Sequence, residues 1–553
     1  MTRTAASPLG FTTNRDERPA QLQELPPTGA IEAQQLSGMV TALPRSLRPV
    51  GSGLLVRNAR VRDWWVGRRP GTSIYMGKPD GNPVHGVITV YLPQERYWLL
   101  RITDQDIYGT RSFDQWVQFA SVGSPLTGTS HLRTTQMLGY LIVATAHTKL
   151  ISVDLNTQSY DEIEQAPRAK FVTSFADRVV AANILDSDLG PSRVQWSRNA
   201  DPFVWDPLEH ESAGEENLIS SPADTGDDIT GLFAMRNTML ILRERSLWMA
   251  SRNPIAIAPF RFEALSVGIG CDLPYSATRV QDAVVWADYR SNAVWLYQPG
   301  QPPQRISDAI RDQLYTDLKN FKWAEGSYDP SENEYHLGLA VDADEHLIHK
   351  VWVFNFNTGQ WTFDDSPDVT TIGQALEMTD LVMIDELTDD IDDQIPIPAD
   401  PLKPNPTGVI DDWSGPEVRA TGVFKGTVTG EILHQSYDYN TDWDGSWFAF
   451  EYQSQNLGSF SRRRTLAGIL VGVEALVGGH VQVSLSVDGH LWFKELSLNC
   501  DPIEGEQTLR LGASPITGHN LFWKLTSYIP QIKMSHWAAK LREQTFEAKD
   551  TSI

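Results

Sequence analysis

The stretch DAVVWADYRSNAVWLYQPG (residues 282–300) shows a pattern that recurs through most of the chain. An apolar run at residues 284–286 is followed by a polar turn at 288–292 and by a second run that ends on Trp295 and Tyr297. Short apolar runs with period-two alternation, joined by a few polar residues, predict two neighbouring antiparallel strands. The stretch is therefore expected to be a β-hairpin.

Segments of this kind follow one another at intervals of about 40 to 60 residues, which is typical of a repeat architecture. Repeated hairpins with almost no helix between them predict an all-β fold whose main part is a β-propeller of about six to seven degenerate blades. A seventh blade would be completed by strands from either end of the chain. A stack of β-sandwiches is the alternative, and it would leave the repeat a coincidence. The hairpin segments cover residues 97–109, 138–155, 176–197, 237–251, 282–300 and 333–363.

The remaining segments differ from the repeats in composition. Residues 1–50 are rich in Pro, Gln and Thr and are expected to be an extended arm, so the propeller is assigned to residues 51–380. Residues 381–414 are first acidic and then rich in proline, which predicts a linker or long surface loop. Residues 415–553 alternate apolar and polar positions between glycine turns, which predicts a C-terminal β-sandwich with a possible return strand to the propeller.

One segment has helical rather than alternating periodicity. In RISDAIRDQLYTDLKN (residues 305–320), apolar residues recur every four positions, and Ser307 or Asp308 is placed to cap the first turn. The spacing predicts one helix packed against the blades. The acidic run DELTDDIDD (residues 385–393) contains oxygen ligands for a hard cation, but it lacks the spacing of a calcium loop and favours a solvated surface segment.

Composition excludes several classes of protein. The 553 residues contain 70 acidic and 46 Lys or Arg side chains, a formal net charge of −24, which argues against a protein that grips nucleic-acid phosphates. Two cysteines, Cys271 and Cys500, are too few for a disulfide scaffold or a zinc ribbon. No phosphate-binding loop, zinc-protease motif or nucleophile elbow is present. We therefore expect no enzymatic activity, catalytic residue, cofactor or metal.

Two clusters of arginine stand out against the acidic background and are predicted to contact protein partners. Arginine pairs with the acidic face of a partner or of another copy of the chain, and tryptophan is a common interface anchor. Scattered surface salt bridges are the alternative for each cluster. The candidate interface residues are Arg57, Arg60, Arg62, Trp64, Trp65, Arg68 and Arg69 in the first cluster, and Arg462, Arg463 and Arg464 in the second.

Several segments together resemble one family. LLVRNARVRDWWVGRRPGTSIY (residues 54–75) is similar to the opening of bacteriophage tail hub proteins, also called head-to-tail stabilisation or tail nozzle proteins, in which an Asn precedes an Arg-Pro-Gly turn by about ten residues. VQWSRNADPFVWDP (residues 194–207) resembles a Trp-Ser segment of the same family. LILRERSLWM (240–249), PYSATRVQDAVVWAD (274–288) and PPQRISDAI (302–310) follow in the order usual for it.

The resemblance implies a structural virion protein of the tail of short-tailed phages, made in the host cytoplasm. Such subunits form a ring, commonly a homo-hexamer, below the portal and adaptor. The ring extends the channel for DNA ejection and anchors fibres, spikes or needles, with DNA only a transient passenger and no membrane insertion. Six copies would carry 6 × −24 = −144 charges, so the lumen is expected to be acidic and the arginine clusters to face protein neighbours.

Two other readings stay open. A carbohydrate-binding or glycoside-hydrolysing propeller is the main alternative. SVDGHLWF (residues 486–493) echoes the Asp box of sialidases, but its spacing is one residue short and it lies outside the repeats, so a simple hairpin turn is expected. The other alternative is a propeller scaffold that stays monomeric inside the cell.

Overall fold

Alternate residues of the blade strands are buried on opposite faces. In β25 (Ala283–Asp288), Val284 and Trp286 pack against the blade before it, whereas Val285 and Ala287 face the core shared with the C-terminal strands. A strand buried on both faces must be covered by a neighbouring sheet on each side. Successive sheets of this kind therefore stack around a common centre.

The structure is a computed structural model. It describes residues 30–44, 47–63, 65–77, 80–92, 96–111, 116–122, 126, 131–186, 190–219, 226–253, 258–316, 324–340, 347–376, 421–458, 463–511 and 516–543.

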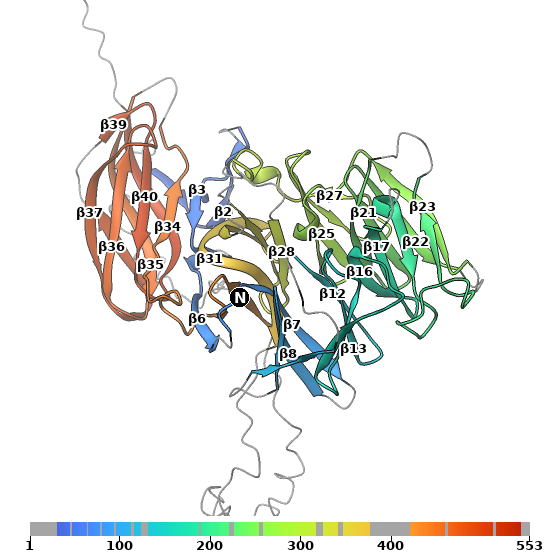
Figure 1. Cartoon of the computed structure of the whole chain (residues 1–553). Helices are drawn as coiled ribbons and strands as arrows, with labels where there is room; N and C mark the ends of the chain where they lie inside the picture. The colour runs from blue at the N-terminus through green and yellow to red at the C-terminus, as the bar shows by residue number, and fades with distance from the viewer. Residues whose placement is uncertain are drawn as a thin grey trace, which may run out of the picture.

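Five separate four- or five-stranded sheets form a five-bladed propeller arrangement (Figure 1). Blade one contains β7 (Val84–Leu92), β8 (Arg96–Thr103), β9 (Ile107–Thr110) and β10 (Val117–Gln118). Blade two contains β11 (Ala120–Ser121), β12 (Arg133–Met137), β13 (Tyr140–Ala144), β14 (Ile151–Asp154) and β15 (Ser159–Glu162). Blade three contains β16 (Ala169–Phe175), β17 (Arg178–Ile184), β18 (Arg193–Trp196) and β19 (Gly214–Asn217). Blade four contains β20 (Ile229–Ala234), β21 (Thr238–Arg243), β22 (Ser246–Arg252) and β23 (Phe260–Val267), and blade five contains β24 (Thr278–Val280), β25, β26 (Ala293–Tyr297) and β27 (Gln304–Arg305).

The other strands make two large sheets. The thirteen-stranded sheet contains β2 (Ser37–Met39), β3 (Ser52–Arg57), β6 (Gly71–Met76), β28 (Ala324–Asp329), β29 (Glu334–Leu339), β30 (Ile348–Asn355), β31 (Gln360–Leu376), β32 (Thr421–Thr427), β33 (Ile432–Ser436), β34 (Phe450–Ser454), β36 (Gly479–Ser486), β37 (Trp492–Cys500) and β40 (Phe522–Ser527). The seven-stranded sheet contains β1 (Ala30–Ala33), β4 (Ala59–Arg62), β5 (Trp65–Arg68), β35 (Arg464–Ala475), β38 (Ile503–Leu511), β39 (Ile516–Gly518) and β41 (Lys533–Glu543).

The prediction of six to seven blades is wrong, because the sixth hairpin unit does not form a sheet of its own. Its last strand, β31, is 17 residues long and pairs in turn with β30, β3 and β32. The unit is thereby merged into the thirteen-stranded sheet. It still lies between blade five and blade one, since β28 contacts β24 and β31 contacts β7.

The predicted helix at residues 305–320 is also wrong over the part that the structure describes, which ends at residue 316. A single 3₁₀ turn, η6 (Asp308–Ile310), stands in its place. The Ser307 hydroxyl accepts a hydrogen bond from the Val294 amide at 2.8 Å instead of capping a helix. The indole N–H of Trp361 in β31 donates to the Ile306 carbonyl at 2.8 Å, and the backbone hydrogen bonds of residues 307–316 are those of isolated turns rather than of a continuous helix. Two further 3₁₀ turns are η3 (Gly190–Ser192) and η5 (Pro274–Ser276).

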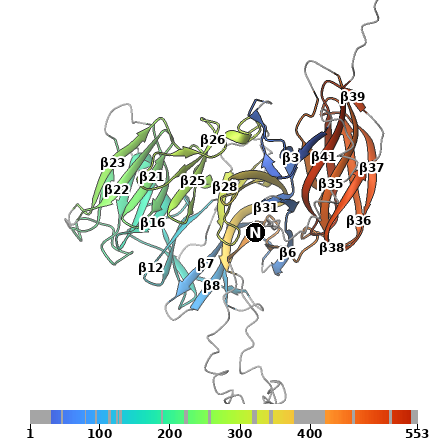
Figure 2. The same cartoon turned by 180° about the vertical axis from the view of Figure 1, so that it is seen from behind.

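The C-terminal strands lie in two sheets that face one another, seen at the left of Figure 1 and at the right of Figure 2. Trp523 of β40 and Trp537 of β41 meet edge to face at 5.4 Å, and both are fully buried. Strands from the start of the chain complete these sheets: β1 pairs with β41, and β3 pairs with β34. Residues 30–76 therefore fold with the C-terminal strands, and the segment 381–414 lies outside the described residues.

Candidate functional site

The first arginine cluster lies at the junction between the propeller and the C-terminal sheets. Arg60, Arg68 and Arg69 are buried side chains, with at most 4% of each residue exposed. Arg60 lies in β4, Arg68 is the last residue of β5, and Arg69 directly follows it. β4 and β5 pair with each other, and β5 also pairs with β41. These three guanidinium groups are thus inside the molecule and are not available to a partner surface.

Arg60 makes the most buried ion pairs of the cluster. Its guanidinium binds the Asp364 carboxylate in a bidentate manner, at 2.7 and 2.9 Å, and its Nε lies 3.0 Å from Oε2 of Glu334. All three side chains are at most 2% exposed. Asp364 belongs to β31 and Glu334 to β29, so one arginine from β4 joins the N-terminal strands to the sixth hairpin unit.

Arg69 forms a second buried pair, with a loop of the C-terminal half. Its guanidinium binds both carboxylate oxygens of Asp442, at 2.7 and 3.0 Å, and lies 3.6 Å from the centre of the Phe448 ring. Its Nε also donates to Oδ1 of Asn58 at 3.1 Å. The structure therefore brings together the Asn and the Arg-Pro-Gly turn that carry the family resemblance. The hydrogen bond between Arg69 and Asn58 lies inside the molecule.

The outer arginines of the cluster are also paired within the chain. Arg62 lies 2.7 Å from Oε1 of Glu334 and also pairs with Glu332. Arg57 lies 2.6 Å from Asp365 and 3.3 Å from Glu451, and its side chain remains partly exposed. Acidic residues on three strands (β29, β31 and β34) and in two loops therefore neutralise every described arginine of the cluster except Arg68.

The carboxyl of Glu334 is strongly affected by these contacts. Burial alone would raise its pKa, but the positive charges of Arg60 and Arg62 more than offset burial and hold the pKa well below its usual range. The carboxylate stays ionised across the physiological range, and its two pairs persist there.

The other predicted interface residues are spread over the surface. Trp65 is half-buried, with the Lys533 ammonium 5.3 Å from its ring, and Arg463 is exposed at the start of β35. Arg464 donates to the Leu457 carbonyl at 3.3 Å. Trp64 and Arg462 lie outside the described residues, as does the acidic run at 385–393.

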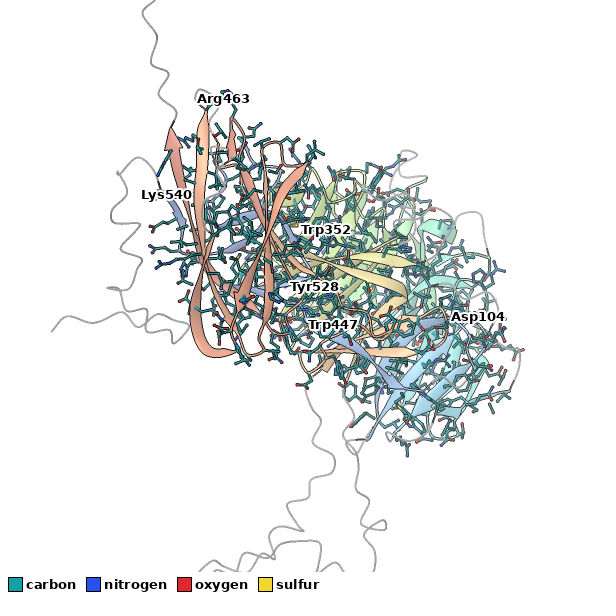
Figure 3. The ribbon with its side chains drawn as sticks, turned by 90° about the vertical axis from the view of Figure 1, so that its left-hand side faces the viewer. Asp104, Trp352, Trp447, Arg463, Tyr528 and Lys540 are labelled. Atoms are coloured by element: carbon teal, nitrogen blue, oxygen red, sulfur yellow. The ribbon has the colours of Figure 1, made fainter. Side chains whose placement is uncertain are left out.

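An exposed apolar group lies at the end of the C-terminal unit opposite Arg463 (Figure 3). Trp447 and Tyr528 are 54% and 51% exposed, and Leu476 and Val477 are exposed to a similar extent. The register places them at one end, because Phe450 pairs with Ser527 and Ser527 pairs with Val481. We call these four residues the end patch.

A polar group lies among the innermost strands of the propeller. Arg133 of β12 donates to the carbonyls of Pro274 and Ala277, and Thr371 donates to Oε1 of Glu325 at 2.6 Å. Burial raises the pKa of Glu325 to about 7, although Thr371 and Arg133 oppose the shift. β28 approaches η5 so closely that a Cβ at Gly326 would lie 1.8 Å from the Ser276 carbonyl oxygen. Only glycine fits there.

A cleft of about 640 Å³ opens between blade four, blade five and strands β28–β31. Its lining has side-chain amides, an ion pair and an apolar floor. Within the described ranges, no group of three or more His, Cys, Asp or Glu side chains could hold a metal ion, and no helix there is long and apolar enough to cross a membrane.

The arginines were identifiable from the sequence, but the acidic residues that pair with them were not. Asp364, Glu334 and Asp442 are three of 70 acids, and no local pattern separates them from the others. A signal did exist for the cleft. Amide residues occur at the equivalent turn of successive hairpin units, at Asn237, Gln281 and Asn333.

Comparisons with known proteins give a fold likeness only. No family model and no curated protein matches the chain. Among solved structures, the extracellular domain of a hybrid two-component system from B. thetaiotaomicron is 8% identical with a TM-score of 0.38, covering 66% of this chain and 39% of that one. The computationally designed protein Ika8 is 12% identical with a TM-score of 0.35, covering 72% of this chain and 99% of that one. Neither likeness bears on function.

Replacing Arg60 by methionine is expected to destabilise the chain strongly. R60M leaves the buried Asp364 carboxylate without its ion-pair partner and leaves Glu334 with Arg62 as its remaining arginine partner, and breaking a buried pair costs about 3–5 kcal/mol. The free energy of unfolding in urea measures the effect. The matched control is R261M, whose pair with Glu263 is exposed at the surface and should change stability by less than about 0.5 kcal/mol. Equal stability of the two variants would contradict a structural role for the Arg60 junction.

Replacing Glu325 by glutamine is expected to have a pH-dependent effect. The carboxyl ionises near 4.5 when unfolded and near 7 when folded, so its buried charge costs stability increasingly as pH rises between these values. The melting temperature of E325Q relative to wild type should therefore rise from pH 4 to pH 8. The control Q118A removes an exposed amide that does not titrate and should show no such trend. A difference that stays constant with pH would refute the raised pKa.

Proposed function

We propose that the protein is a structural subunit of a phage tail, in which copies associate into a ring, commonly of six, below the portal and adaptor. The order of family-like segments from residue 54 to 320 supports this assignment. In the ring, the propeller and the C-terminal two-sheet unit, which we propose to be a β-sandwich, would act as one rigid wedge. DNA would pass through the lumen, and fibres or spikes would attach to the ring.

The end patch is the observation that carries the proposal of self-association. Large apolar side chains that cluster in solvent mark interaction sites, and Trp and Tyr supply much of the binding energy in protein interfaces. Tyr528 directly follows β40, and Trp447 lies in the loop before the neighbouring strand β34, with the Arg68 guanidinium 5.7 Å from its ring. We propose a second copy of the chain as the partner that covers these side chains.

The buried arginines change the proposed chemistry of the contact between subunits. Four of these arginines, Arg57, Arg60, Arg62 and Arg69, cannot supply a basic interface, because their charges are matched by acids of the same chain. The fifth, Arg68, is buried and donates to the Asn440 carbonyl at 2.7 Å. The contact is therefore proposed to be mainly apolar at its centre. Ion pairs within the chain do not change its net charge of −24. This negative charge agrees with a lumen that repels DNA.

Light scattering coupled to size-exclusion chromatography tests the proposal. The full-length chain, alone or mixed with portal and adaptor proteins, is expected to form a ring of about 6 × 61.8 kDa. W447E/Y528E should shift it to monomer, because two buried carboxylates would oppose the contact. The control L208E changes an exposed leucine on the propeller and should leave the assembly intact. A monomer under every condition would contradict the proposed function.

A further inference from the structure

The cleft between blade four, blade five and β28–β31 is formed by turns that share one face of the propeller. Turns that join the first to the second strand of each antiparallel sheet emerge on one face, together with those that join the third to the fourth. Met235 to Thr238, Gln281 and Asn333 belong to first-to-second turns, and Gln298 and Phe356 to third-to-fourth turns. Three neighbouring sheets thus contribute to a single cleft, whose volume of about 640 Å³ is in the range of small-ligand sites.

The floor of the cleft is apolar. Met235, Val280 and Ala283 are buried, and Leu296 and Phe356 are partly buried. Phe356 is held edge to face against Tyr328 at 6.2 Å and against Phe354 at 5.0 Å. A ligand must therefore present one apolar face to this floor.

The rim of the cleft is polar and rich in amides. Asn237, Gln281 and Gln298 are exposed around it. Each amide offers a donor and an acceptor side by side, which matches two adjacent hydroxyl groups. Arg236 and Asp282 form an ion pair of 3.1 Å on the same rim and neutralise one another.

Part of the rim is preorganised by a hydrogen-bond chain. Nε2 of Gln281 donates to the Tyr328 hydroxyl at 3.3 Å, and that hydroxyl donates to Oδ1 of Asn333 at 2.9 Å. Nδ2 of Asn333 donates in turn to Oδ1 of Asn357 at 2.7 Å. By contrast, the side-chain amides of Asn237 and Gln298 have no partner among the residues that the structure describes. Their hydrogen-bonding capacity is available to a ligand.

We propose that this cleft binds a neutral carbohydrate, as a pyranose unit of an oligosaccharide. A pyranose has a C–H face that suits the apolar floor and a ring of hydroxyl groups that suits the amide rim. The rim carries no net charge, and the chain is strongly acidic, so an anionic sugar would be disfavoured. The proposal does not depend on ring formation, since every residue of the cleft comes from one chain.

Binding of the full-length protein to a panel of neutral and sialylated oligosaccharides tests the proposal. A glycan array identifies the ligand, and isothermal titration calorimetry measures its affinity. At least one neutral oligosaccharide should bind, and N237A/Q298A should weaken its affinity at least tenfold. Both substituted side chains are exposed, so the variant should keep the wild-type melting temperature.

The matched control is Q118A/N499A, which removes two exposed amides from strands outside the cleft. It should bind the oligosaccharide with wild-type affinity. Three results would overturn the proposal: no binding of any neutral oligosaccharide at about 10 mM, a concentration that detects even millimolar affinities; unchanged affinity of N237A/Q298A; or preference for a sialylated glycan over its neutral parent. None of these results bears on the oligomeric state, so the two proposals can fail separately.

Discussion

The buried guanidinium of Arg60 is the contact on which the arrangement of the whole chain depends. It joins β4 to β29 and β31, and β4 lies in the same sheet as β41, the last strand that the structure describes. Two carboxylates and one arginine, each at most 2% exposed, are costly to bury and tolerable only while they remain together. Because these buried charges must stay paired, they hold the N-terminal strands, the sixth hairpin unit and the C-terminal sheets in one relative position.

The blades were predictable because their signal is local. Period-two alternation located two inner strands of each of the five separate sheets, including β25 and β26 within residues 282–300. The blade count was not predictable, because it depends on what β31 pairs with beyond its own hairpin. β3 and β32, which complete that pairing, lie far away in sequence, and no periodicity within residues 333–363 distinguishes a free blade from one merged into a larger sheet.

The burial of the arginines was also not predictable, because it depends on residues that are distant in sequence. A run of basic residues in an acidic chain is visible in sequence, whereas its burial depends on Asp364, Glu334 and Asp442, which come from distant segments. The predicted helix failed for a related reason, since the hydroxyl of Ser307 serves β26 rather than a helical turn. In both cases, contacts with residues distant in sequence determined the role of a side chain for which the local sequence pattern predicted a different role.

Differential scanning calorimetry of the full-length chain tests whether the propeller and the C-terminal sheets form one cooperative body. The sixth hairpin unit shares the thirteen-stranded sheet and the Arg60 pairs with the N- and C-terminal strands, and it also contacts blades five and one. A single transition is therefore expected for the whole protein. Two separable transitions in the wild-type chain, one for the propeller and one for the C-terminal sheets, would contradict it.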